Sequence, residues 1–188
     1  MSSKKFFMLF LVVCTIFCFS ACSSNNQKTQ KVLVTMENGK TFTIETAPQY
    51  APETVSNFIN LVESDFYDGL TFHRIIDGFV AQGGDPKGNG TGGSDKKIKG
   101  EFSANGFSQN TLKHTRGVIS MARSQAMDSA SSQFFICYDD APHLDSQYAA
   151  FGQVIEGMET IDEFLEIQRD ASGMPATPIV IKTMEIIE

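Results

Sequence analysis

One short stretch near the middle of the chain carries the side chains best suited to chemistry. Residues 72–85 (FHRIIDGFVAQGGD) place one guanidinium, Arg74, and one carboxamide, Gln82, among several apolar residues. Apolar and polar side chains alternate around Asp77-Gly78, a pattern typical of two short strands joined by a tight turn. The stretch holds no obvious nucleophile, base or metal cluster. Such a site could orient and polarise an amide but has little means of cleaving it.

A simpler interpretation of the same stretch needs no function. A strand pair that carries Phe, Ile and Val can be a core hairpin, and Arg74 can be a surface residue whose aliphatic stem lies along the protein. Composition alone favours this simpler interpretation. The rest of the chain is therefore needed to decide between the two.

The surrounding elements are predicted to be mainly strands. Besides the pair within 71–84, alternating patterns predict strands at 31–36, 40–45 and 179–187. Short strands are also predicted at 118–122, 133–138 and 149–154. Helical spacing of apolar residues predicts two helices, at 51–62 and 158–167. Because strands dominate and the helices are far apart in sequence, we expect a mainly β fold. Its predicted form is a closed eight-stranded antiparallel barrel capped by two α-helices.

The N-terminus is predicted to be a leader followed by a tether. In residues 1–21 two lysines precede an apolar run that ends in small residues, as in a signal peptide; the run is short for a spanning helix, which needs about 20 apolar residues. Residues 19–22 (FSAC) resemble the lipobox of bacterial lipoproteins, where the cysteine, here Cys22, becomes the lipidated first residue. The polar segment 22–30 is then a lipidated N-terminus with a flexible tether, and 31–188 is one domain.

This leader leads us to expect a protein anchored by lipid to the extracytoplasmic face of a bacterial cell membrane. An ordinary secretory signal with an unmodified Cys22 is the alternative. The formal net charge is −7, and nucleic-acid binding is not expected because it needs clustered Lys and Arg. Cys137 lies in an apolar run and is predicted to be a buried small hydrophobic residue. The three histidines lack ligand spacing, so no metal is expected.

Several motifs along the chain resemble the signature of the cyclophilins, the peptidyl-prolyl cis–trans isomerases. In chain order they are 72–74 (FHR), 78–79 (GF), 82–85 (QGGD), 89–93 (NGTGG), 100–102 (GEF), 114–117 (HTRG), 120–122 (SMA), 131–136 (SSQFFI), 144–145 (LD) and 151–154 (FGQV). The resemblance runs from about residue 31 to residue 188. Several ordered motifs at consistent spacing are far more specific than any one of them alone.

The resemblance implies a role for each matching residue. The implied catalytic set is Arg74, as the catalytic arginine, with Phe79 in the wall of a proline pocket and Gln82 holding the substrate backbone. The implied substrate-binding residues are Val80, Ala122, Arg123, Gln133, Phe135, His143, Leu144 and Tyr148. The implied partners are proline-containing peptides and unfolded exported proteins, and no cofactor is implied. The sequence is silent on oligomeric state, and a monomer is the default expectation.

The implied chemistry agrees with the side chains present. Rotation about a peptide bond costs about 18–20 kcal/mol because resonance gives the bond double-bond character. In the twisted transition state the prolyl nitrogen loses conjugation and becomes a better acceptor. A fixed guanidinium that donates to this nitrogen binds the twisted amide more strongly than the planar one, and this difference accelerates rotation. Arg suits the role because it stays charged and presents a rigid donor fork.

Two hypotheses for the function remain open at this point. The first is a membrane-tethered isomerase that accelerates X-Pro rotation in proteins folding outside the cytoplasm. The second is a peptide-binding chaperone or adhesion lipoprotein that does little catalysis. His143 stands where the cyclosporin-sensitive cyclophilins carry Trp, so we expect weak cyclosporin binding. A hydrolase is disfavoured because no Ser or Cys lies in a nucleophile-like context with a plausible base.

Overall fold

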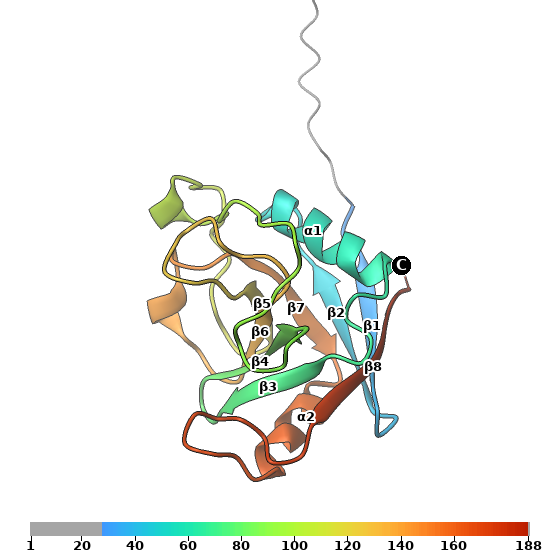
Figure 1. Cartoon of the computed structure of the whole chain (residues 1–188). Helices are drawn as coiled ribbons and strands as arrows, with labels where there is room; N and C mark the ends of the chain where they lie inside the picture. Colours follow the sequence, from blue (N-terminus) through green and yellow to red (C-terminus); the bar gives the residue numbers. More distant parts are fainter. Residues whose placement is uncertain (1–27, 188) are drawn as a thin grey trace, which may run out of the picture.

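Eight antiparallel strands close into one barrel (Figure 1), which confirms the predicted fold. The computed structural model describes residues 28–187. Its strands are β1 (Lys31–Met36), β2 (Thr41–Thr46), β3 (Thr71–Ile76), β4 (Val80–Asp85), β5 (Val118–Met121), β6 (Phe134–Cys137), β7 (Ala150–Glu156) and β8 (Ile179–Ile186). Their order around the barrel is β1-β2-β7-β5-β6-β4-β3-β8, and pairing of β8 with β1 closes it. Closure leaves no sheet edge to pair with another chain.

The N-terminal predictions fall almost entirely outside this region. The leader 1–21, Cys22 and most of the tether are not among the described residues. Gln30, at the end of the predicted tether, is hydrogen-bonded to Thr46, whose backbone N–H donates to the Gln30 carbonyl at 2.9 Å. Within residues 28–187, no helix has both the length and the apolar character needed to cross a membrane.

Two helical segments lie at opposite ends of the barrel (Figure 1). The first, α1 (Pro52–Glu63), begins with a proline at a position where the missing N–H costs no hydrogen bond. The second was predicted as one helix over 158–167, but α2 (Met158–Asp162) is followed by a 3₁₀ turn, η3 (Glu163–Glu166). Acidic side chains fill the end of this segment, where the helix dipole favours cations, and this explains why the α-helix is short.

A column of aromatic rings fills the barrel from end to end. Phe58 of α1 packs edge-on against Phe134 at 6.0 Å, and Phe134 packs against Phe72 at 5.8 Å. Phe72 then meets Phe164 of η3, with ring centroids 5.0 Å apart. All four rings are buried. Each end of the column comes from one of the two helical segments, so burial of these rings attaches both segments to the barrel.

A second apolar cluster lies on the outer face of the same strands. It contains Val80, Phe135, Cys137, Ala141 and Leu144. In β6, neighbouring residues alternate between the two clusters, because successive strand side chains point to opposite faces. Phe134 thus faces the barrel interior and Phe135 faces outward.

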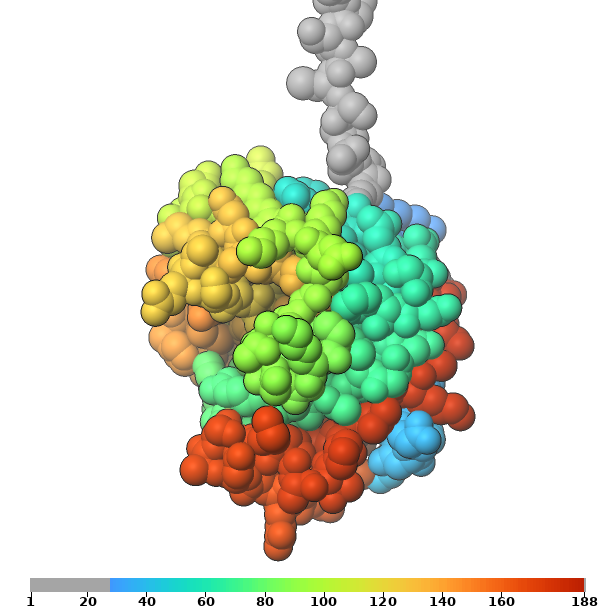
Figure 2. All heavy atoms as spheres, viewed as in Figure 1, coloured from blue at the N-terminus to red at the C-terminus, as the bar shows by residue number. Residues whose placement is uncertain are grey.

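The chain between β4 and β5 is mostly irregular, with one short 3₁₀ turn, η1 (Ser103–Asn105). A further turn, η2 (Pro142–Leu144), precedes β7. Figure 2 shows the irregular segment, in green and yellow-green, lying across the surface between the turquoise α1 and the yellow-to-orange residues beyond 120. The η2 turn contributes Leu144 to the outer cluster, and His114, from the end of the irregular segment, stacks on Phe135 of that cluster.

Candidate active site

Two β-bulges direct Arg74 to the outer face of the barrel. In the β3–β4 pair, Phe72 is opposite Gly83 and Arg74 is opposite Gln82, so His73 is an extra residue. Gly84 is the corresponding extra residue on β4, with φ of 79°. A bulge breaks the simple alternation and redirects the side chains that follow. Phe72 and Ile75 can therefore both be buried in the barrel, while Arg74 lies outside it.

The outer cluster forms the floor of a hollow beside Arg74. The hollow has a volume of about 210 Å³ and is lined by Arg74, Phe79, Val80, Gln82, Ala122, Arg123, Phe135, Leu144 and Tyr148. Phe135 is almost fully buried at 5 % exposure and meets Tyr148 edge-on, with centroids 5.7 Å apart. The Arg74 guanidinium carbon lies 6.0 Å from the centre of the Phe79 ring. An apolar slot with a cation and an amide at its rim is thus present.

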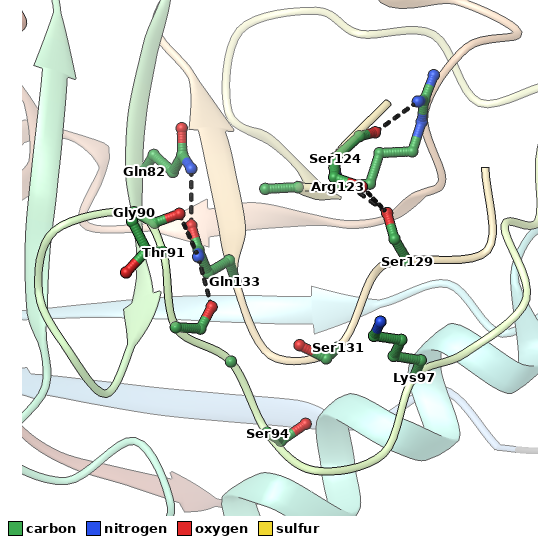
Figure 3. A pocket seen from close by; sticks show the side chains of 13 residues that line it. Gln82, Gly90, Thr91, Ser94, Lys97, Arg123, Ser124, Ser129, Ser131 and Gln133 are labelled. Carbon is green, nitrogen blue, oxygen red and sulfur yellow. Dashed lines mark hydrogen bonds between the residues drawn. The ribbon is translucent and has the colours of Figure 1, made fainter. Parts of the chain in front are cut away.

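A chain of hydrogen bonds holds the polar rim in place, and Figure 3 shows the part of it around Gln133. Arg74 Nη1 donates to Gln82 Oε1 at 3.4 Å, and Gln82 Nε2 donates to Gln133 Oε1 at 2.9 Å. Gln133 Nε2 in turn donates to the backbone oxygens of Gly90 and Gly92, at 3.1 and 2.7 Å. The two carboxamides therefore connect the arginine to the irregular segment after β4.

A second hollow adjoins the first. It has a volume of about 360 Å³ and shares Gln82, Ala122 and Arg123 with the apolar slot. Figure 3 shows hydroxyl and amide groups around it, among them Gln133 and Ser131, with Lys97 at its edge. An extended peptide lying along Ala122 would contact both hollows.

Comparison with known proteins places this site in a family. The family model described as "Cyclophilin type peptidyl-prolyl cis-trans isomerase/CLD" matches residues 31–186. This chain is a cyclophilin. The match spans the whole barrel with both helical segments, and it confirms the family resemblance.

Individual relatives agree with this membership. The chain is similar to a peptidyl-prolyl cis–trans isomerase of Helicobacter pylori strain J99, with 45% identity over 128 residues, or 67% of this chain and 75% of the relative. A crystal structure of a Cryptosporidium parvum cyclophilin type isomerase matches with a TM-score of 0.77 and 32% identity, covering 86% of this chain and 99% of that one. A second structure of that protein, in the presence of the dipeptide Ala-Pro, matches with a TM-score of 0.76 and 34% identity over 85% of this chain and 99% of that one.

The cyclophilin site brings most of the residues predicted from the sequence into one place. All of the predicted residues except Gln133 and His143 line the apolar slot. Gln133 lines the neighbouring hollow and reaches the slot through Gln82. His143 is exposed and stacks on the outer side of Phe79, with ring centroids 5.4 Å apart. It therefore extends the apolar rim without lining the slot.

Arg123 differs most from its predicted role as a contact for the peptide. Arg123 borders both hollows, and its guanidinium group donates to the backbone oxygens of Ser124 and Gln147. Figure 3 shows the group pointing away from the second hollow. The donors that would serve a substrate are already used inside the protein.

Sequence reasoning missed a buried network directly beneath the cyclophilin slot. His114 Nδ1 lies 3.1 Å from Asp145 Oδ1, and His114 Nε2 lies 3.0 Å from Ser120 Oγ. The His114 ring stacks on Phe135 with centroids 6.0 Å apart. Burial lowers the pKa of His114 below its ordinary value, although Asp145 partly opposes this. Each member of the network lies in one of the family motifs, at 114–117, 120–122 and 144–145, but the motifs gave no sign that the three residues are hydrogen-bonded to one another.

This network has the composition of a hydrolase triad but not its accessibility. Ser120 is 0% exposed and His114 is 2% exposed, so no substrate carbonyl can reach the hydroxyl. Nucleophilic catalysis needs an accessible nucleophile beside its base. The network can instead hold Phe135 from below. Burial also raises the pKa of the Cys137 thiol to about 12, which keeps this residue protonated and inert. Within residues 28–187, no cluster of His, Cys, Asp and Glu could bind a metal ion.

Proposed function

We propose that this cyclophilin is a monomeric, lipid-anchored isomerase that accelerates X-Pro rotation in proteins folding outside the cytoplasm. Family membership supports the reaction, and the Ala-Pro dipeptide present with the Cryptosporidium parvum relative supports proline-containing substrates. The leader 1–21 and the cysteine at position 22 support export and anchoring. The observation that carries the proposal is the Arg74 guanidinium at the rim of an apolar slot of about 210 Å³.

The slot would bind the proline ring and leave the preceding peptide bond free to rotate. Phe135 and Leu144 offer apolar walls that are already packed, so little side-chain entropy is lost when the ring enters. Gln82 would hold the peptide backbone beside Ala122. These contacts are equal for the planar and twisted amide, so they provide affinity rather than acceleration.

Acceleration would come from Arg74. As the amide twists, its nitrogen lone pair localises, and Arg74 would donate a hydrogen bond to it. The guanidinium already lies beside Gln82, so the protein does not have to reorganise when the acceptor develops. Because an uncatalysed X-Pro bond isomerises over tens of seconds, even a modest preference for the twisted amide is useful to a folding protein.

The reaction is tested with a protease-coupled assay on a peptide that contains Ala-Pro. The full chain should convert the cis peptide faster than the uncatalysed control, at a rate proportional to enzyme concentration. Binding of the peptide without acceleration would refute the isomerase proposal and favour the alternative function, a peptide-binding chaperone or adhesion lipoprotein.

The anchor is tested separately by mass spectrometry of the mature N-terminus. We expect the mature chain to begin at Cys22 and to carry lipid, and a Cys22→Ser variant to lose both the lipid and the membrane fraction. Cys18→Ser is the matched control, since this cysteine leaves with the leader. A mature protein with an unmodified Cys22 would contradict the anchor and leave the isomerase proposal untouched.

A further inference from the structure

Every nitrogen of the Arg123 guanidinium is engaged by the protein itself. Nε and Nη2 both donate to the backbone oxygen of Gln147, at 3.1 and 2.9 Å. Nη1 donates to the oxygens of Ser124 and Gln125, at 2.9 and 3.4 Å. The fork thus joins the turn after β5 to the turn before β7. A planar guanidinium suits such a bridge because its donors point in fixed directions.

Aromatic rings complete the arrangement around this group. The guanidinium carbon lies 4.7 Å from the centroid of Tyr148 and 5.1 Å from that of Phe102. Both distances are within the range of cation–π attraction. Phe102 is buried at 1% exposure, so the ring on which the guanidinium packs is itself fixed in the core. The guanidinium in turn packs against Tyr148.

The bridged segment carries part of the proline slot. Residues 144–148 form a turn in which the backbone N–H of Tyr148 donates to the Leu144 oxygen at 3.2 Å. Leu144 and Tyr148, at its two ends, both line the slot. The Gln147 oxygen that Arg123 binds lies between them in sequence. Tyr148 also meets Phe135 edge-on, so a shift of this turn would alter three walls of the slot.

We infer that Arg123 is a positioning residue, which fixes the 144–148 turn so that Leu144 and Tyr148 form a preorganised proline slot. The inference deepens the proposed function, since it rests on the slot being the place where the proline ring binds. It replaces the sequence-based prediction that Arg123 contacts the peptide. Arg123 still borders both hollows, but the charge acts through the turn and not on the substrate.

Two substitutions separate these roles in the full chain. Arg123→Met keeps an unbranched apolar side chain but removes the guanidinium group. Arg123→Lys keeps the aliphatic chain and the positive charge but lacks the planar guanidinium. We expect both variants to raise KM for an Ala-Pro peptide about five- to tenfold, the effect of losing one or two charged hydrogen bonds that hold a binding wall. kcat should stay within about twofold, because Arg74 is untouched. The NMR signals of the Phe135 and Tyr148 rings should shift in both variants before any peptide is added.

Arg169→Ala is the matched control. Its Nη1 also donates to three backbone oxygens, those of Phe164, Leu165 and Ile167, at 3.2, 2.7 and 3.1 Å. None of these residues lines the slot. Arg169→Ala should lower the melting temperature about as much as Arg123→Met and leave KM unchanged. If a general loss of stability raised KM, KM would rise in both Arg169→Ala and Arg123→Met. If Arg123 positions the slot, KM should rise in Arg123→Met alone.

The outcomes distinguish the inference from the function beneath it. A wild-type KM in Arg123→Met overturns the inference. A raised KM in Arg123→Met with a wild-type KM in Arg123→Lys also overturns it, because a positive charge without the planar fork would then be sufficient. In a Tyr148→Leu background, Arg123→Met should raise KM less than it does in the wild type, and a full additional rise would also contradict the bridge. If the wild-type chain shows no isomerase activity, the proposed function fails and not this inference alone.

Discussion

Arg74 and Gln82 face each other across the β3–β4 pair, with Nη1 of the arginine 3.4 Å from Oε1 of the carboxamide. The extra residue at His73 makes this pairing possible, because it turns Arg74 out of the barrel while its neighbours stay buried. Gln82 is itself held by Gln133. Arg74, the proposed donor to the twisted amide, therefore lies on paired strands, and the carboxamides of Gln82 and Gln133 support it through successive hydrogen bonds.

Removal of the Arg74 guanidinium should abolish most of the activity without unfolding the protein. Arg74 is only partly buried and belongs to neither apolar cluster. Loss of one preorganised donor typically costs about 10²- to 10³-fold in kcat. We expect Arg74→Ala to show this loss in the protease-coupled assay with a melting temperature near that of the wild type. Arg116→Ala, which removes an exposed arginine paired with Asp162, should keep its activity. Unchanged turnover in Arg74→Ala would end the mechanistic argument.

Gln133→Leu should weaken catalysis through its neighbours. The substitution keeps the approximate size of the side chain but removes the hydrogen bonds to Gln82, Gly90 and Gly92. The freed Gln82 would then hold the peptide less firmly, and kcat/KM should fall about tenfold. Steady-state kinetics on the Ala-Pro peptide measure the change. A Gln133→Leu variant with wild-type kcat/KM would show that the chain of amides has no part in the reaction.

The acid sensitivity of the fold should depend on His73. This ring is 5% exposed, and within residues 28–187 neither of its nitrogens has a well-formed hydrogen bond. Burial lowers the pKa of His73; Asp85 and the nearby Thr71 backbone oppose the shift, and Arg74 adds to it. The unfolded state therefore binds a proton more readily than the folded state.

It follows that stability is lost as the pH falls through the unfolded histidine pKa of about 6.5 towards the lower folded value. His114 shifts in the same direction. Replacing His73 by Phe removes one of the two contributions, and the slope of unfolding free energy against pH should decrease by up to about 1.4 kcal/mol per pH unit. Urea unfolding between pH 7 and pH 5 measures it. An equal slope in His73→Phe and wild type would contradict the prediction.

Cyclosporin should bind this cyclophilin weakly. His143 stands where the sensitive members of the family carry Trp, and the imidazole stacks on Phe79 at the exposed rim. A histidine ring offers less apolar area than an indole and no indole N–H in the same place. A His143→Trp variant should therefore bind cyclosporin at least about tenfold more tightly than the wild type. Nanomolar affinity of the unchanged chain in a titration would refute the expectation.

The sequence was sufficient for the features that depend on local pattern. Alternation of apolar residues along 31–36 and 179–187, short apolar runs such as 133–138 and turn residues between strands predicted eight strands and a closed barrel. The ordered motifs around Arg74, Gln133 and Phe135 predicted the family. The apolar run around Cys137 also predicted that this residue is buried. These features follow from side-chain period and backbone preference, which neighbouring residues in the chain decide.

Tertiary structure alone decided how the site is held together. The bulges at His73 and Gly84 are defined by how β3 pairs with β4. The sequence of β3 alone does not reveal them. The family resemblance places Arg123 beside the bound peptide, and only the fold shows that its guanidinium donates to the carbonyl of Gln147, 24 residues away. The chain from Asp145 through His114 to Ser120 likewise joins distant segments beneath the slot. The sequence shows which side chains can donate or accept hydrogen bonds. Which donor meets which acceptor depends on the packing of segments that are distant in sequence.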